Sequence, residues 1–281
     1  MHGLLVVDKP GGLTSFDVVH QVRRALGVKK VGHTGTLDPM ATGVLPVCVG
    51  DATRIAQFIT EATKAYDATV KLGATTDTLD AEGKVLQTRE IPPVTRELLE
   101  AALSRFRGTF PQIPPMYSAV KVGGKRLYEL ARAGEEVERQ PREVTVYELT
   151  LRDFSADEVK LSVRCSKGFF VRTLAAELGE ALGCGAHLCA LRRTHSGPFT
   201  LAQAVPLAEV TSASPLLSLL EALRDIPALE VSAADAQRVR HGGVVEVSPS
   251  LSGVHRVMAD GALLAMADAV RGRLVYRRVL V

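Results

Sequence analysis

The most informative segment of the chain reads Val31-Gly-His-Thr-Gly-Thr-Leu-Asp-Pro-Met-Ala-Thr-Gly43. It places three glycines, three threonines, one histidine and one aspartate between a predicted helix over 15–26 and the apolar run 44–49. Glycines and short hydroxylated side chains allow the backbone to approach a ligand closely. The segment therefore predicts a functional loop between a helix and a buried strand.

The flanking sequence gives the elements around this loop. An apolar run over 4–7 predicts a buried strand, and the helix over 15–26 has Ser15 as its expected N-cap and Gly27 as its expected C-terminal cap. Beyond the loop, alternating patterns predict further strands over 65–72, 144–151 and 159–165, and apolar spacing predicts helices over 96–106, 172–182 and 233–240.

Length and composition indicate a folded globular protein. The 281 residues suit one large domain, or one large and one small domain, and 46% apolar with 23% charged residues excludes wholesale disorder. The net charge of +3 neither requires nor excludes a polyanionic partner. Charge is uneven along the chain, because 105–142 holds eight basic and four acidic residues, and 160–193 holds six and two. Such segments are either RNA-facing or ordinary solvated surfaces.

A change of character near 206–227, where the chain becomes rich in serine, proline and leucine, indicates a boundary. We therefore expect domains at 1–226 and 227–281, with an RNA-binding insertion at about 105–142. The first residues are too poor in aliphatics for a signal peptide, and no apolar run approaches membrane-spanning length. The expected location is the cytoplasm. The four cysteines lack C-x-x-C spacing, so we expect reduced thiols and no metal site.

Asp38 is the leading catalytic candidate. A carboxylate in a glycine-rich loop can attack an electrophilic carbon or stabilise an oxocarbenium-like centre. The alternative is structural, because Asp-Pro is a common turn pair in which the side chain caps a backbone N–H. His33 is similarly open to three interpretations: a general base, a phosphate contact, or a histidine satisfied by the backbone.

The run over 32–43 resembles the catalytic signature of the tRNA pseudouridine-55 synthases, the bacterial TruB family. Further segments resemble the same family in the same order. They are Asp8-Lys9-Pro10, Lys64-Ala-Tyr66, Leu72-Gly-Ala-Thr-Thr-Asp-Thr-Leu-Asp80, Pro115-Met-Tyr-Ser-Ala119, Cys165-Ser-Lys-Gly168, Val171-Arg172-Thr173 and Leu191-Arg192-Arg193. In the tail, Arg238-Val-Arg-His-Gly242 is similar to the start of a PUA RNA-binding module.

The resemblance implies an α+β fold in which helices flank a mixed, largely antiparallel central sheet, followed by a small β-rich PUA-like domain. It implies an isomerase that converts uridine to pseudouridine at position 55 in the T loop of tRNA. The reaction breaks the N1–C1′ bond and joins C5 to C1′ without redox change, so no cofactor is expected. The expected partner is the tRNA T stem-loop, with no protein partner. The lack of an obvious exposed apolar stripe favours a monomer.

The resemblance also implies roles for individual residues. Asp38 matches the nucleophile and Arg172 the arginine that pairs with it. Tyr66 and Leu191 match the ring and the apolar wall that hold the extruded base, and His33 matches a residue that fills the place the flipped bases leave. Lys9 and Phe170 are assigned to substrate binding. Phe170 departs from the family, which commonly has tyrosine there.

Residue statistics alone favour plainer interpretations: core residues for Tyr66 and Leu191, and a solvated helix residue for Arg172. Two other functions stay open. One is a nucleoside or glycosyl hydrolase that uses Asp38 with Asp77 or Asp80. The other is a non-catalytic chaperone that refolds the tRNA elbow through the same basic surface.

Overall fold

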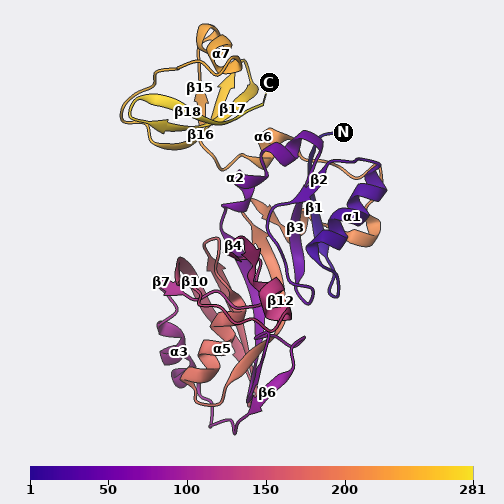
Figure 1. The fold of residues 1–281 in the computed structure, drawn as a ribbon, viewed down its shortest axis with the longest axis vertical. Coiled ribbons are helices and arrows are strands. Elements are labelled where there is room, and N and C mark those ends of the chain that lie inside the picture. Colours follow the sequence, from indigo (N-terminus) through magenta and orange to yellow (C-terminus); the bar gives the residue numbers. More distant parts are fainter. Residues whose placement is uncertain (281) are drawn as a thin grey trace.

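The computed structural model describes residues 1–280, and its main feature is a ten-stranded mixed sheet (Figure 1). Eight strands form the path β14-β1-β3-β12-β4-β11-β10-β7, with β2 on β3 and β13 on β12. The β1–β14 and β3–β12 pairs are parallel and the others are antiparallel. The bounds are β1 Gly3–Lys9, β2 Val31–His33, β3 Thr42–Val49, β4 Lys64–Leu72, β7 Gly108–Gln112, β10 Arg142–Phe154, β11 Glu158–Cys165, β12 Ala186–Ser196, β13 Phe199–Thr200 and β14 Val205–Pro206. The expected α+β class is confirmed.

Strand β12 joins the two halves of this sheet. It pairs with β3 at Arg192–Thr42 and Arg193–Gly43, and with β4 along nearly its whole length. The functional loop, which connects β2 to β3, therefore lies beside residues that are about 150 positions further along the chain.

Three helices cover one side of the sheet and enclose the main apolar core. They are α1 (Ser15–Leu26), α3 (Arg96–Ser104) and α5 (Val171–Ala181). Apolar residues at helical spacing face the sheet, such as Val18, Val22 and Leu26 in α1. On the other side of β1 and β3, a second cluster includes α2 (Ala56–Thr60) and α6 (Leu219–Ala222).

The start of α1 corrects one expectation. The N-cap is Thr14, whose hydroxyl accepts from the Asp17 N–H while the Asp17 carboxylate accepts from the Thr14 N–H. The predicted cap, Ser15, lies inside the helix and binds the functional loop instead, as described below. Gly27 does form the expected left-handed cap, with φ of 64°.

The remaining elements of the large sheet region are short. The turn after β4 contains the hairpin β5 (Ala74–Thr76) and β6 (Val85–Thr88). The segment 105–142 contains a second hairpin, β8 (Lys121–Val122) and β9 (Lys125–Arg126), followed by α4 (Leu127–Arg132). Three 3₁₀ turns complete the region: η1 (Gly50–Arg54), η2 (Leu201–Gln203) and η3 (Leu207–Glu209).

The C-terminal residues form a separate four-stranded sheet, drawn in yellow in Figure 1. It contains β15 (Ala228–Glu230), β16 (Gly253–Ala259), β17 (Ala262–Val270) and β18 (Arg273–Val279), together with α7 (Ala233–Arg240). This part has its own apolar core. We keep the division into 1–226 and 227–281 as a proposal, which this C-terminal core supports. No helix within residues 1–280 is both long and apolar enough to span a lipid bilayer.

Candidate active site

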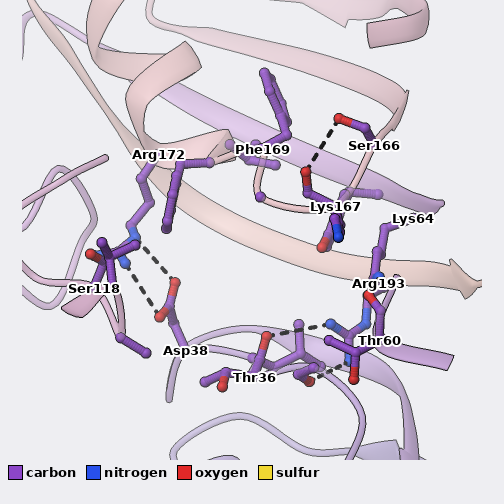
Figure 2. A pocket seen from close by; sticks show the side chains of 18 of the residues that line it. Thr36, Asp38, Thr60, Lys64, Ser118, Ser166, Lys167, Phe169, Arg172 and Arg193 are labelled. Atoms are coloured by element: carbon purple, nitrogen blue, oxygen red, sulfur yellow. Dashed lines mark hydrogen bonds and ion pairs between the residues drawn. The ribbon is translucent and has the colours of Figure 1, made fainter. Parts of the chain in front are cut away.

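A pocket of about 420 Å³ opens between the β2–β3 loop, the start of β4, the segment 118–121 and the turn before α5 (Figure 2). Ordinary small-molecule sites have volumes of this size. The sequence candidates Asp38, Tyr66, Phe170, Arg172 and Leu191 all line it.

Two buried side chains support the loop from below. The Lys9 ammonium donates to the carbonyls of Pro10, Pro39 and Ala41 at 2.8, 3.0 and 2.7 Å. The Ser15 hydroxyl accepts from the Leu37 N–H at 2.8 Å and is 3.0 Å from the Leu37 carbonyl. Lys9 is fully buried and is not among the residues that line the pocket. Lys9 therefore supports the loop from behind in this structure, and its assignment to substrate binding stays a prediction.

Arg193 on β12 ties the same loop to the sheet. Its guanidinium donates to the carbonyls of Val44, Gly35 and Thr36 at 2.7, 3.1 and 3.4 Å. Gly43, with φ of 102°, crosses β12 so closely that a Cβ would lie 2.2 Å from the Arg193 carbonyl oxygen. Only glycine fits this crossing, which explains the residue that ends the loop.

Asp38 and Arg172 face each other across the pocket. Arg172 Nε lies 3.1 Å from Asp38 Oδ2, and one terminal nitrogen lies 3.3 Å from Oδ1, so the pair is bidentate. Arg172 sits in the first turn of α5 and is only 5% exposed. Its other N–H groups reach the carbonyls of Thr78 and Tyr117, at 3.1 and 2.7 Å, and the carboxylate of Asp80 at 3.4 Å. The arginine is thereby fixed in one orientation.

Asp80 is the second carboxylate on this arginine. It accepts from the Thr78 hydroxyl at 2.6 Å and from the Glu82 N–H at 3.1 Å, and it is 3% exposed. The sequence offered it only as a partner for Asp38 in a hydrolase. The structure places it behind Arg172, outside the pocket lining.

The charges around Asp38 act on its pKa in opposite directions. Burial raises the pKa of Asp38 above its usual value, and the negative charge of Asp80 adds to this rise, whereas Arg172 opposes it. Burial also raises the pKa of the Tyr66 hydroxyl, so this residue is neutral at physiological pH. The pocket therefore contains one partly buried carboxylate, whose side chain is 34% exposed.

An aromatic and apolar wall completes the pocket. Tyr66 projects from β4, Leu191 is a buried residue of β12, and Phe169 and Phe170 precede α5. The Gln112 side chain fixes Phe170 by accepting from its N–H at 2.8 Å and donating to its carbonyl at 3.1 Å. This wall can hold a planar ring in front of Asp38.

His33, like Lys9, is a candidate that does not line the pocket. It lies at the end of β2, half-buried, and its Nδ1 has no hydrogen-bond partner within residues 1–280. Burial lowers the pKa of His33, and the positive charge of Arg193 lowers it further, so the ring is neutral.

Sequence reasoning missed several lining residues. Lys64, Ser118 and Arg193 line the pocket and are buried. Arg193 could have been found from the sequence, because it lies two residues after Leu191 on β12. Side chains two residues apart in a strand face the same side of the sheet. Within residues 1–280, no group of three or more histidine, cysteine, aspartate or glutamate residues could hold a metal ion.

The sequence of the chain matches proteins of a known family. Residues 23–171 match the family described as "TruB family pseudouridylate synthase (N terminal domain)", and residues 172–225 match "tRNA pseudouridylate synthase B C-terminal domain". The chain is 45% identical to a "tRNA pseudouridine synthase B" of Dechloromonas aromatica (strain RCB), over 99% of this chain and 95% of the relative. It is 54% identical to one of Symbiobacterium thermophilum, over 85% of this chain and 82% of the relative.

Solved structures show the same fold. A structure described as "Crystal Structure of a Cbf5-Nop10-Gar1 Complex" superposes with a TM-score of 0.78 at 25% identity, covering 99% of this chain and 85% of that one. Another, "Structure of H/ACA RNP bound to a substrate RNA containing 2'-deoxyuridine", gives a TM-score of 0.76 at 22% identity, with the same coverage of each chain. The chain thus belongs to the TruB family of pseudouridylate synthases, and it is an enzyme, a pseudouridine synthase.

Proposed function

We propose that this enzyme isomerises uridine 55 in the T loop of tRNA to pseudouridine, with Asp38 as the nucleophile. The curated relatives named tRNA pseudouridine synthase B support a tRNA substrate. The observation that carries the assignment of Asp38 is its bidentate contact with Arg172 in a pocket lined by aromatic side chains.

The chemistry requires a single carboxylate. The N1–C1′ bond of uridine breaks, the base turns, and C5 bonds to C1′; the C5 proton leaves and N1 gains a proton. The sum is an isomerisation, so neither electrons nor a transferred group must be supplied. Asp38 is the one carboxylate among the described lining residues, and Arg172 aims it into the pocket.

Substrate access requires base extrusion. A uridine in a folded T loop is stacked, and an extruded pyrimidine needs an aromatic face and an apolar wall. Tyr66 and Leu191 supply these two surfaces beside Asp38. Phe170 adds a ring without a hydroxyl, so we assign it packing and no proton transfer.

The positions of the other two acidic candidates argue against a hydrolase. Hydrolysis of a glycosidic bond commonly uses two carboxylates that face the substrate. Asp80 is buried behind Arg172, and Asp77 accepts from the Lys84 N–H at 2.8 Å outside the pocket lining.

The test is release of the C5 proton from labelled uridine in a T-arm minihelix. We expect wild type to release it and Asp38→Asn to release none, while RNA affinity stays within about tenfold, because the nucleophile contributes little to ground-state binding. The Asp77→Asn protein is the matched control and should retain activity. Normal turnover by Asp38→Asn would refute the nucleophile, free uracil would indicate the hydrolase, and RNA refolding by wild type without proton release would indicate the chaperone.

A further inference from the structure

Two buried cations line the pocket away from the Asp38–Arg172 pair (Figure 2). Lys64 is 6% exposed and Arg193 is 1% exposed. Arg193 pairs with Tyr66 across β12 and β4, and Lys64 precedes Tyr66 by two residues on the same strand. The three side chains therefore project from one face of the sheet into one pocket.

Neither cation has an acidic partner within residues 1–280. The Lys64 ammonium donates to the carbonyls of Thr60 and Ala62, and the Arg193 guanidinium donates to carbonyls of the loop and of β3. Arg172, in the same pocket, contacts two carboxylates. Carbonyl dipoles orient Lys64 and Arg193 but do not neutralise them.

This arrangement is costly without an anion. A buried charge is stable when it is paired, and two like charges close together add repulsion. Burial, with a further contribution from Arg193, lowers the pKa of Lys64 to about 8. The wider lining is also cationic: it includes six basic side chains, namely Lys64, Lys121, Arg142, Lys167, Arg172 and Arg193, against Asp38 alone among the described lining residues.

We propose that Lys64 and Arg193 form a phosphate subsite, which binds an RNA backbone phosphate adjacent to the uridine that reacts. The inference rests on the proposed function and identifies how its substrate is held. Tyr66 contacts the base, and Lys64 lies about 7 Å away along β4, a distance that a ribose can bridge. The phosphate supplies the negative charge that the two cations lack, and so fixes the register of the extruded nucleotide.

A combined change in protein and RNA tests the contact. The probes are T-arm minihelices in which one of the two phosphates flanking the target uridine is a neutral methylphosphonate. At one of the two positions, this replacement should weaken binding by wild type about tenfold or more. Lys64→Met should lose a similar factor with normal RNA, and should lose little more with the neutral RNA. Lys71→Met is the matched control, because Lys71 lies on the opposite face of β4 outside the pocket lining.

Two further results decide the inference. If Lys64→Met and the methylphosphonate weaken RNA binding independently at both positions, so that their fold-losses multiply, the subsite is wrong. Independent losses are the result expected for Lys71→Met. Lys64→Arg retains the charge and should retain sensitivity to the neutral phosphate, which keeps the test valid if the methionine variant does not fold. The subsite is also wrong if wild type binds both methylphosphonate RNAs as tightly as it binds normal RNA. Pseudouridine formation in unmodified RNA is scored separately, so a failure of the proposed function is distinguishable.

Discussion

At the scale of single residues, the state of Asp38 depends on a carboxylate that does not touch the pocket. Asp80 contacts the same guanidinium as Asp38 and is almost completely buried. It fixes Arg172, and its charge adds to the rise in the pKa of Asp38 that burial causes. Asp80 is thus a positioning residue with an electrostatic effect that can be measured.

The pH profile should report this effect. In its proposed role as nucleophile, Asp38 must be ionised, so kcat/KM should fall as pH decreases through a pKa above the usual carboxyl range. Asp80→Asn removes a negative charge that disfavours ionisation of Asp38, and therefore should move this acidic limb to lower pH. In Asp80→Asn, kcat/KM on the pH-independent plateau should also fall by about tenfold, because Arg172 loses a charged partner.

A matched variant separates charge from general damage. Asp77 lies in the same turn as Asp80 but does not contact Arg172. Asp77→Asn should leave the acidic limb in place. An unchanged or higher pKa in Asp80→Asn, measured from kcat/KM against pH, contradicts the electrostatic role of Asp80.

At the scale of elements, the close approach of α5 to β12 holds Arg172 in position. Gly179 lies on the inner side of α5, where a Cβ would be 2.1 Å from the backbone nitrogen of Ala186. Gly179→Ala should therefore destabilise the protein by about 2–3 kcal/mol, because the contact is with backbone that cannot turn aside. Chemical denaturation measures the loss.

Gly32→Ala is the control for this prediction. Gly32 has an ordinary backbone conformation, and no atom lies near the position of an added Cβ. The free energy of unfolding of Gly32→Ala should stay within about 0.5 kcal/mol of the wild-type value. If both variants have equal stability, the packing of α5 on β12 does not depend on glycine.

The elements themselves were largely predictable, whereas the site was predictable only in part. The helix over 15–26 and the strands follow from local apolar spacing, so their positions agree with the structure. The N-cap of α1 is Thr14 and not the predicted Ser15. The Ser15 hydroxyl is bound to Leu37, which lies far along the chain, and local sequence does not reveal this contact. The contacts of Asp80 and Arg193 join segments that are 92 and about 150 residues apart, and no local pattern encodes such pairs.

At the scale of the whole molecule, the C-terminal sheet is attached to the large sheet through its last residues. Arg54 donates to the carbonyls of Val279 and Leu280, and Met266 of β17 packs in the same apolar cluster as Leu4 and Phe58. The two parts should therefore unfold together in the intact protein.

Arg54→Ala should weaken this coupling by about 1 kcal/mol, because two hydrogen bonds between the parts are lost. Calorimetry should show a broadened or split transition, while pseudouridine formation persists. Arg273→Ala, an exposed change within the C-terminal sheet, is the control and should keep the wild-type transition. A single sharp transition in Arg54→Ala at the wild-type temperature would contradict the coupling.

The position of β12 between β3 and β4 has a consequence for biosynthesis. The loop that contains Asp38 is made early, but its anchor Arg193 is made about 150 residues later. Contacts this distant in sequence slow folding, because a long chain segment must close before they form. During translation, the nascent chain therefore has no assembled active site until residues 186–196 have emerged and inserted into the sheet. A ribosome-bound fragment that ends before β12 should be catalytically silent, even though it already carries Asp38, the proposed nucleophile.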